Sequence, residues 1–531
     1  MKRKLIGGAS FFTLILLVYI LFFPGSKTPT SASVYSGPGV KLFQNYCMAC
    51  HGQTGKGDGD LAYLLYPKPR DFTKGVFKIR STPSGQMPTD QDLQKTVHNG
   101  MPGTAMPSFH YLKQNEIQEI VSYVKSLSQD CTTQPCRNFF AEKTTQQVAV
   151  PQPLAPSTEL VASGKQAYTL LGCHQCHGMS GKGDGASSAG LKDDWGYPIQ
   201  VRDFTTGTYV GGGKPEDLYL RFVTGLNGTP MPAYGDTIHQ VAGSEKERQE
   251  MIWGLIYYVK SLETGAGKSQ TAGGSVISKN VPQIKGSDVM NPFGAQWNQA
   301  PETSFPLSRL WQRGSSNSAE VKVRSLYNDD FVAVMLEWDD ASQQASSYAV
   351  QEFQDAAAVQ FSLTGTPGFH GMGGKANPCN LWFWRSEWQF RSDTRTESDI
   401  AKKYPQRAID SNVKTYPQEI QDEARLAGRD AGNLVSQQTV RSPIEDMNAL
   451  GPGTLTSQPA QQQNVNGKGQ WNGKVWRVVF VRDRKSADRG GDIQFKAGKS
   501  YPLAFAVWNG SERDRNGQKL VSTWYSLELK K

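Results

Sequence analysis

The sequence predicts a multidomain protein with an N-terminal transmembrane helix, two small all-α domains and a C-terminal, mainly-β sandwich. Three observations support this fold class: one long apolar run near the N-terminus, an internal duplication, and a series of short aromatic and β-branched segments after residue 285. A length of 531 residues is compatible with about three domains joined by linkers. Because only one segment is apolar enough to enter a bilayer, a polytopic membrane protein is excluded.

The apolar run extends from Leu5 to Phe23 and contains no charged residue. A helix of this length, at about 1.5 Å per residue, nearly spans a hydrocarbon core about 30 Å thick. The basic residues of Met1-Lys2-Arg3-Lys4 precede it, which predicts a cytoplasmic N-terminus. We therefore expect residues 1–24 to anchor the chain in a bacterial inner membrane, with its bulk in the periplasm. A signal peptide cleaved near Ser31-Ala32-Ser33, which would leave a soluble periplasmic protein, is the alternative.

The duplication lies within residues 37–263, and each copy begins with a Cys-x-x-Cys-His motif. The two motifs are Cys47-Met-Ala-Cys50-His51 and Cys173-His-Gln-Cys176-His177. This pattern attaches c-type haem, because the two cysteines form thioethers and the histidine ligates the iron. Later blocks repeat in the same order: Arg70-Asp71-Phe72 with Arg202-Asp203-Phe204, Gly103-Thr-Ala-Met106 with Gly228-Thr-Pro-Met231, and Tyr123-Val-Lys-Ser-Leu127 with Tyr258-Val-Lys-Ser-Leu262.

Each copy is expected to close with an amphipathic helix, because apolar residues recur at helical spacing. These residues are Ile117, Ile120, Val121, Val124 and Leu127 in the first copy, and Ile252, Leu255, Ile256, Val259 and Leu262 in the second. The predicted domains are residues 37–130 and 160–263, and the segments 131–159 and 264–284 are predicted linkers. Cys131 and Cys136 are expected to form a disulfide, since export places them in an oxidising compartment.

Both copies resemble class I cytochrome c domains, in which a haem motif is followed by a Met-Pro loop and a C-terminal helix. The resemblance implies two covalent haem c groups and the axial pairs His51–Met106 and His177–Met231. Methionine ligation would place both haems at the high end of the range of haem potentials. Met101 is the rival to Met106, but only Met106 has a counterpart in the second copy. The resemblance also implies that the carbonyls of Pro67 and Pro198 accept a hydrogen bond from the ligating histidines.

The third domain, residues 285–531, is predicted to be a β-sandwich because its segments are short, apolar and bounded by turn residues. The expected strands are 321–323, 331–338, 357–362, 381–384, 476–481, 503–508 and 521–526. The polar stretch 391–470, with a helix-like part near 415–437, is interpreted as an insertion. Cys379 is expected to be a buried free thiol.

Several phrases of this domain resemble the haem-binding gamma subunit of the ethylbenzene dehydrogenase and class II DMSO reductase family. They are Leu336-Glu-Trp-Asp-Asp340, Gly371-Met372-Gly373, Leu381-Trp-Phe-Trp384, Ala506-Val-Trp-Asn-Gly510 and Lys519-Leu-Val-Ser-Thr-Trp524. The resemblance implies one non-covalent haem b between a methionine and a lysine, and Met372 and Lys519 are the candidates. His370 and Lys375 are their nearest rivals.

The predicted function is electron transfer through an anchored chain with two haems c and one haem b. Electrons would pass between a molybdopterin oxidoreductase with iron–sulfur subunits and a soluble or membrane cytochrome or terminal oxidase. Because both axial positions of each iron would be filled and no catalytic constellation is evident, a non-catalytic subunit is expected. A net charge of +9 without a dense basic tract does not predict nucleic-acid binding.

Two alternatives come from other functional classes. One is a haem enzyme in which an iron with an open position acts on a small inorganic anion. The other is a dihaem subunit of the terminal-oxidase type with a haem-free β domain that docks a protein or a carbohydrate, for which Trp382, Trp384 and Trp388 are candidate contact residues.

Overall fold

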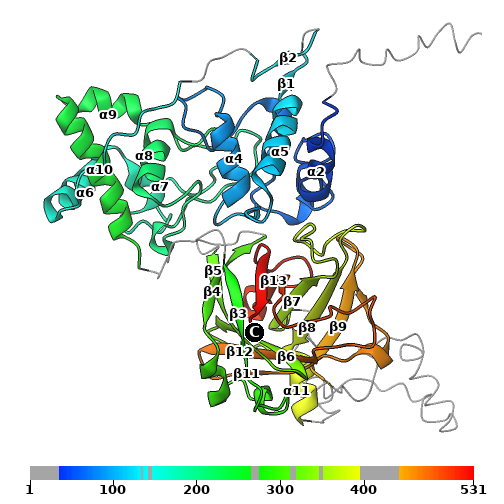
Figure 1. Ribbon diagram of the computed structural model, residues 1–531. Coiled ribbons are helices and arrows are strands. Elements are labelled where there is room, and N and C mark those ends of the chain that lie inside the picture. Colours follow the sequence, from blue (N-terminus) through cyan, green and yellow to red (C-terminus); the bar gives the residue numbers. More distant parts are fainter. Residues whose placement is uncertain are drawn as a thin grey trace, which may run out of the picture.

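Two helical units and a large β domain make up the computed structural model (Figure 1). It describes residues 35–132, 135–141, 146–264, 274–310, 318–345, 351–394 and 442–531. The anchor predicted for residues 1–24 and the helix-like part of the predicted insertion lie outside these ranges. Within them, no helix has both the length and the hydropathy that crossing a bilayer requires.

The first unit is a small helical domain whose first and last long helices cross. Its elements are α2 (Gly39–Tyr46), α3 (Met48–His51), η1 (Ala62–Leu64), η2 (Phe72–Lys74), α4 (Asp90–Asn99) and α5 (Gln114–Leu127). The predicted closing helix is confirmed, and its apolar residues from Ile117 to Val124 are buried. α2 approaches α5 closely because Gly39 has no side chain: a Cβ atom there would collide with the carbonyl of Glu119.

The second unit repeats this arrangement. Its elements are α6 (Thr158–Leu170), α7 (Cys173–His177), η3 (Phe204–Thr206), α8 (Pro215–Thr224), α9 (Gly235–Val241) and α10 (Glu245–Ser261). α10 is the second predicted closing helix, and its apolar face is likewise buried. α6 crosses α10 where Gly164 faces Gly254, since a Cβ atom on Gly164 would overlap the Gly254 carbonyl.

The segment between the units is partly packed rather than a free linker. Cys131 and Cys136 form the expected disulfide. It lies beside two short antiparallel strands of two residues each, β1 (Gln129–Asp130) and β2 (Arg137–Asn138). Phe139 then packs on the core of the first unit, and Leu154 packs on the core of the second. The connection therefore helps to hold the two units together.

In the part of the β domain that the structure describes, thirteen strands form one continuous, mostly antiparallel sheet. The strands are β3 (Ser275–Asn280), β4 (Thr303–Arg309), β5 (Ser318–Tyr327), β6 (Phe331–Asp339), β7 (Ala356–Ser362), β8 (Cys379–Arg385), β9 (Ile444–Ala449), β10 (Thr456–Ser457), β11 (Asn466–Trp471), β12 (Val475–Asp483), β13 (Ser500–Trp508), β14 (Leu520–Val521) and β15 (Tyr525–Leu529). Short helices η4 (Asp288–Met290), η5 (Ala295–Gln299), α11 (Ser386–Thr394), η8 (Ala460–Gln462) and η9 (Gly510–Glu512) connect them.

The sheet folds back on itself around a tryptophan-rich core. Trp384 of β8 and Trp476 of β12 come from strands far apart in the sheet order, yet their ring centroids are only 4.8 Å apart. Gly469 of β11 makes this approach possible, because a Cβ atom there would collide with the Trp384 ring. Trp382, Trp384 and Trp388 are at most 4% exposed. The expectation that these tryptophans contact a ligand at the surface is therefore wrong; they form the core.

Two segment boundaries differ from the sequence-based expectation. The predicted linker 264–284 contains β3, which pairs in parallel with both β15 and β5. The predicted insertion 391–470 contains β9, β10 and β11, so it ends near residue 443 instead. β9 looks like a loop because it is polar, but its acidic side chains find partners inside the domain: Glu445 pairs with Arg385 at 2.6 Å.

Asp446 of β9 gives a testable pH dependence. It is fully buried, and burial together with the neighbouring Asp492 raises its pKa to about 8. Since an unfolded aspartate has a pKa of about 3.9, the protonated carboxyl stabilises the fold below about pH 4, and this contribution is lost as the pH rises toward 8. We expect a loss of about 1.4 kcal/mol per pH unit in that window.

Asp446→Asn should abolish this loss, because the amide stays neutral at every pH. Urea unfolding of the β domain between pH 5 and 8 would measure it, with the exposed Asp483→Asn as the matched control. A free-energy difference between parent and Asp446→Asn that stays constant across this range would contradict the assignment.

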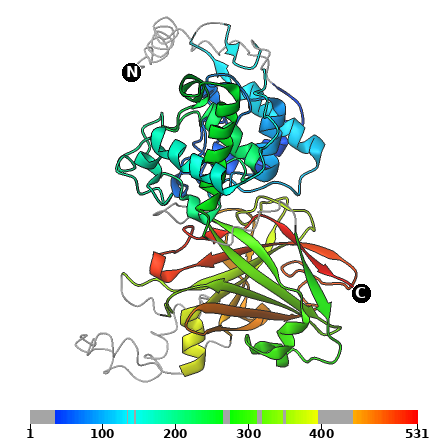
Figure 2. The same cartoon turned by 90° about the vertical axis from the view of Figure 1, so that its left-hand side faces the viewer.

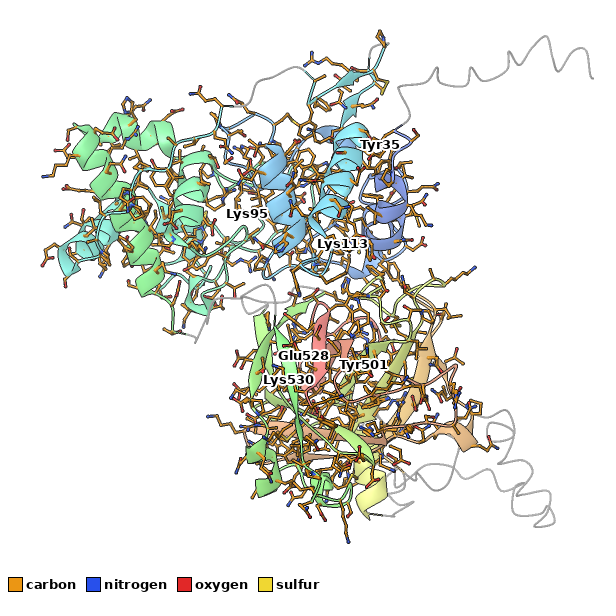
Figure 3. All side chains as sticks on the ribbon, in the orientation of Figure 1. Tyr35, Lys95, Lys113, Tyr501, Glu528 and Lys530 are labelled. Carbon is orange, nitrogen blue, oxygen red and sulfur yellow. A yellow bond between two sulfur atoms is a disulfide. The ribbon has the colours of Figure 1, made fainter. Side chains whose placement is uncertain are left out.

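The three parts contact one another directly, with the helical units on one side of the β domain (Figure 2). Lys95 of α4 lies 2.5 Å from Asp217 of α8, at the boundary between the two units (Figure 3). The first unit also touches the β domain, since the Tyr46 hydroxyl donates to the Pro367 carbonyl at 3.3 Å. The Thr523 hydroxyl of the β domain donates to a carbonyl of the first unit.

Candidate functional site

The first Cys-x-x-Cys-His motif forms the short helix α3 and the turn before it. The Nδ1 atom of His51 lies 3.1 Å from the carbonyl oxygen of Arg70. A carbonyl only accepts hydrogen bonds, so Nδ1 carries the proton and Nε2 is left to bind iron. The expectation that Pro67 provides this carbonyl is wrong. The backbone turn explains why Arg70 is the acceptor. Asp71 caps η2, and this turn presents the preceding Arg70 carbonyl to the histidine.

Phe72 of the same turn holds the imidazole in place. Its ring stacks on His51 with a centroid distance of 4.5 Å. Burial lowers the pKa of His51 to about 4, so the ring is neutral at pH 7, as ligation of iron requires. The motif cysteines, Cys47 and Cys50, are not disulfide-bonded and remain available for thioether bonds.

A largely apolar cavity joins these residues to Met106. Its lining includes Cys47, Cys50, His51, Met101 and Met106. The amide of Met101 donates to the Met106 carbonyl, and in the second unit Leu226 makes the same bond to Met231. Met101 therefore corresponds to a leucine, which cannot ligate iron, whereas Met106 corresponds to a methionine. The apolar lining, the neutral imidazole and the thioether sulfur fit a covalently attached haem.

The second unit repeats the local geometry of the first. His177 Nδ1 lies 3.2 Å from the Arg202 carbonyl, so here too the expected proline, Pro198, is not the acceptor. Phe204 stacks on His177 at 4.3 Å, and burial lowers the pKa of His177 to about 4. Met231 packs against the cluster that contains Cys173. The duplication seen in the sequence is therefore also a duplication of the ligand-holding hydrogen bonds.

Arginines from the two units cross between them. The guanidinium of Arg70 lies 4.1 Å from the ring of Trp195 in the second unit. It also abuts Gly228 in the Met231 loop, while Arg202 abuts Gly103 in the Met106 loop. Each arginine thus holds the histidine of its own unit with its backbone carbonyl and reaches the methionine loop of the other unit with its side chain.

A half-buried lysine completes this cationic cluster. Desolvation, together with Arg70 and Arg202, lowers the pKa of Lys78 to about 7. Arg70 and Lys78 both line the first cavity. Half-buried cations that repel one another favour a bound anion, and haem supplies carboxylates. Sequence reasoning did not identify this cluster, although the repeated Arg-Asp-Phe block contained two of its members.

The β domain presents a second apolar surface on the side of β7, β8 and β13 that faces away from its core. Small residues line it: Ala358 pairs with Ala506, and Ala356 pairs with Trp508. These residues, with Phe383, form one buried apolar cluster, and a second cluster around Leu381 and Ala504 adjoins it through the same Phe383. Alanines on adjacent strands leave a flat apolar floor, which suits a planar ligand.

Met372 lies at one end of this floor, against the cluster that contains Leu381 and Ala504. Its φ of 73° is a conformation that residues other than glycine rarely adopt, and such strain is concentrated at functional sites. Lys519 lies at the other end, with Nζ 4.6 Å from the Trp508 ring. Burial lowers the pKa of Lys519 to about 8, which makes the neutral amine accessible for ligation.

The structure also separates these two candidates from their rivals. Lys375 is exposed to solvent, unlike Lys519. His370 lines the cavity of the first unit together with Phe369, so this loop of the β domain closes the cavity that contains His51 and Met106. The thiol of Cys379 is free and buried, and its pKa is raised to about 12, as expected for an inert side chain.

Two parts of the chain match known protein families. Residues 36–128 match the cytochrome c family, and residues 294–520 match the ethylbenzene dehydrogenase family. The first unit is therefore a cytochrome c domain, which carries a haem c.

Two curated proteins are similar to about half of the chain. A Haloferax mediterranei protein, described as a respiratory nitrate reductase heme subunit, is 26% identical over 257 residues, covering 47% of this chain and 70% of its own length. The chlorate reductase subunit gamma of Ideonella dechloratans is 23% identical over 257 residues, covering 47% of this chain and 83% of its own length.

Two solved structures are also similar to parts of the chain. A chain of the reducing HAO-like protein complex of Kuenenia stuttgartiensis is 39% identical, with a TM-score of 0.38, and the match covers 42% of this chain and 95% of that one. A family 9 carbohydrate binding module from Caldicellulosiruptor kristjanssonii is 9% identical, with a TM-score of 0.25, over 48% of this chain and 94% of that one. These TM-scores are too low to establish a shared architecture.

Proposed function

We propose that the chain is the electron-transfer subunit of a molybdenum oxidoreductase, exported and anchored by residues 1–24, with two covalent haems and one haem b. One observation carries the proposal: the floor between Met372 and Lys519 belongs to the domain whose Phe369 and His370 close the first haem cavity. Two cofactor positions are thereby brought next to each other. A binding domain that served only to dock a partner would not need this contact.

The second unit is proposed to be a second cytochrome c domain. The family match stops at residue 128, so this assignment rests on the internal duplication. His177, its carbonyl partner Arg202 and the Met231 loop reproduce the hydrogen bonds of the first unit. Because Arg70 and Arg202 cross between the units, the proposed carboxylate-binding ends would face each other.

The residues explain why the sites would transfer electrons rather than transform a substrate. His51 with Met106, and His177 with Met231, would hold the two irons and leave no position for a substrate. The carbonyls of Arg70 and Arg202 hold the histidines in one tautomer, which limits rearrangement when the charge changes. Bound haem supplies a one-electron centre whose potential is set by these ligands.

The partners are inferred from the relatives. Because those proteins are described as a nitrate reductase heme subunit and a chlorate reductase subunit gamma, we propose a molybdopterin enzyme with iron–sulfur subunits as one partner. A soluble or membrane cytochrome, or a terminal oxidase, would be the other. In this arrangement, the β domain faces the molybdenum enzyme and the second helical unit faces the cytochrome.

A haem count on the full-length protein tests the proposal. Protein made with a c-type maturation system is analysed as its pyridine haemochrome, before and after acid–acetone extraction. We expect two covalent haems and one extractable haem b per chain, all low-spin. Absence of extractable haem from folded protein would favour a haem-free docking domain. A high-spin iron with an open position would instead favour an enzyme that acts on a small inorganic anion.

A further inference from the structure

Two polar atoms are buried without a partner at the junction between the first unit and the β domain. They are the Nδ1 atom of His370 and the hydroxyl oxygen of Tyr111, neither of which has a hydrogen-bond partner among the described residues. Buried polar groups in proteins are nearly always hydrogen-bonded, because an unpaired one has lost its hydrogen bonds to water without replacement. Two such atoms from different domains at one junction point to a polar ligand there.

Both side chains lie in the same neighbourhood. The rings of Tyr111 and Tyr46 are 6.4 Å apart, and Tyr46 lines the first haem cavity together with His370. Tyr111 also packs on the cluster that contains Met372, so it touches the floor of the β domain. His370 precedes Met372 by two residues in the same loop of the β domain. The junction therefore adjoins both cofactor positions.

The chemistry of the junction favours an anionic oxygen ligand. A tyrosine hydroxyl and an imidazole N–H can both donate hydrogen bonds, and hydrogen bonds to a charged acceptor are the stronger ones. Haem carries two propionate carboxylates, and the proposed haem positions of the first unit and of the β domain both adjoin this junction. The cavity of the first unit already has Arg70 and Lys78 for its own carboxylates. A carboxylate at the junction would therefore belong to the haem of the β domain.

We propose that His370 Nδ1–H and the Tyr111 hydroxyl donate hydrogen bonds to a propionate of the haem held between Met372 and Lys519. This inference rests on the proposed function, because it requires a haem in the β domain. His370 and Tyr111 are positioning residues in this arrangement, and each domain supplies one of them. The first unit thus becomes part of the haem b site, which orders the relay as β domain, first unit, second unit.

The affinity of the protein for haem tests this propionate contact directly. In full-length protein, the non-covalent haem is removed by mild acid extraction, and the protein, which keeps its covalent haems, is titrated with protohaem or with protohaem dimethyl ester. The ester lacks free carboxylates. We compare the parent with His370→Leu and Tyr111→Phe.

Two matched controls accompany these variants. His110→Leu removes an imidazole at the same interface, where its ring lies 5.6 Å from Tyr525 but outside the cavity lining. Tyr123→Phe removes a tyrosine hydroxyl in the same unit, away from the junction.

We expect His370→Leu and Tyr111→Phe each to weaken protohaem binding by about tenfold to a hundredfold. Binding of the dimethyl ester should not change, and both controls should bind like the parent. Equal weakening for protohaem and its ester, or no weakening at all, would overturn the proposal. A shift in the potential of a covalent haem with unchanged protohaem affinity would also overturn it, because the carboxylate would then belong to the first unit.

Failure of the parent protein to bind protohaem would overturn the haem b assignment itself. This outcome differs from loss of the propionate contact, in which the parent still binds protohaem. Tyr111→Phe removes only one oxygen atom. It therefore carries the test if His370→Leu does not fold.

Discussion

Replacement of Lys519 by leucine is expected to remove the extractable haem from the protein while both covalent haems remain. Lys519 lies at one end of the alanine floor, and burial lowers its pKa toward the range in which an amine can bind iron. Leucine keeps much of the buried apolar volume but supplies no ligand. The pyridine haemochrome spectrum before and after acid–acetone extraction gives the number of haems of each type.

Lys375→Leu is the matched control, because this lysine belongs to the same domain, follows Met372 by three residues and is exposed. It should retain the haem of the parent. Loss of haem from Lys375→Leu, or full retention in Lys519→Leu, would show that the lysine ligand is misassigned. Met372→Leu should behave like Lys519→Leu, since Met372 flanks the same floor from the other end.

Replacement of Met106 by leucine is expected to turn one covalent haem from low-spin to high-spin and to lower its potential. Methionine is a weak donor that raises the haem potential, and leucine removes the sulfur with little change in volume. The cost in folding free energy should stay below about 1.5 kcal/mol, as for other volume-conserving changes. Spectroelectrochemical titration of the full-length protein resolves the two covalent haems and shows which one changes.

Met101→Leu is the control for this change, because Leu226 already occupies the corresponding position in the second unit. It should leave both spin states and both potentials unaltered. A high-spin haem in Met101→Leu, combined with a low-spin haem in Met106→Leu, would reverse the assignment of the axial ligand.

Local features were predictable from the sequence where a short segment determines the outcome. The closing helices α5 and α10 have a regular apolar spacing, and both bury the predicted faces. The pairing of Cys131 with Cys136 follows from their closeness along the chain. The strands that contain Trp338, Trp382 and Trp508 were recognisable because apolar β-branched and aromatic residues are frequent in them.

Other elements depend on contacts between residues that are far apart in the sequence. β9 is a strand because Glu445 and Asp446 find Arg385 and Asn380 across the sheet, and a polar segment without such partners would remain a loop. The carbonyl acceptor of His51 is Arg70 rather than Pro67, because the Asp71 cap orients the turn. In the first case, contacts between residues far apart in the sequence override the local pattern. In the second case, the geometry of a turn does so.

By itself, the sequence was enough to predict which residues would hold iron: the two Cys-x-x-Cys-His motifs, Met106, Met231, Met372 and Lys519. The duplication marks the residues of the two helical units, and the family resemblance marks Met372 and Lys519, without knowledge of their placement. Only the tertiary structure decided how the sites are joined. The loop that carries His370 closes the cavity of a domain more than 200 residues away, and Arg70 and Arg202 cross between units. The order of the proposed relay depends on these contacts, because they form only when three separately folded parts pack against one another.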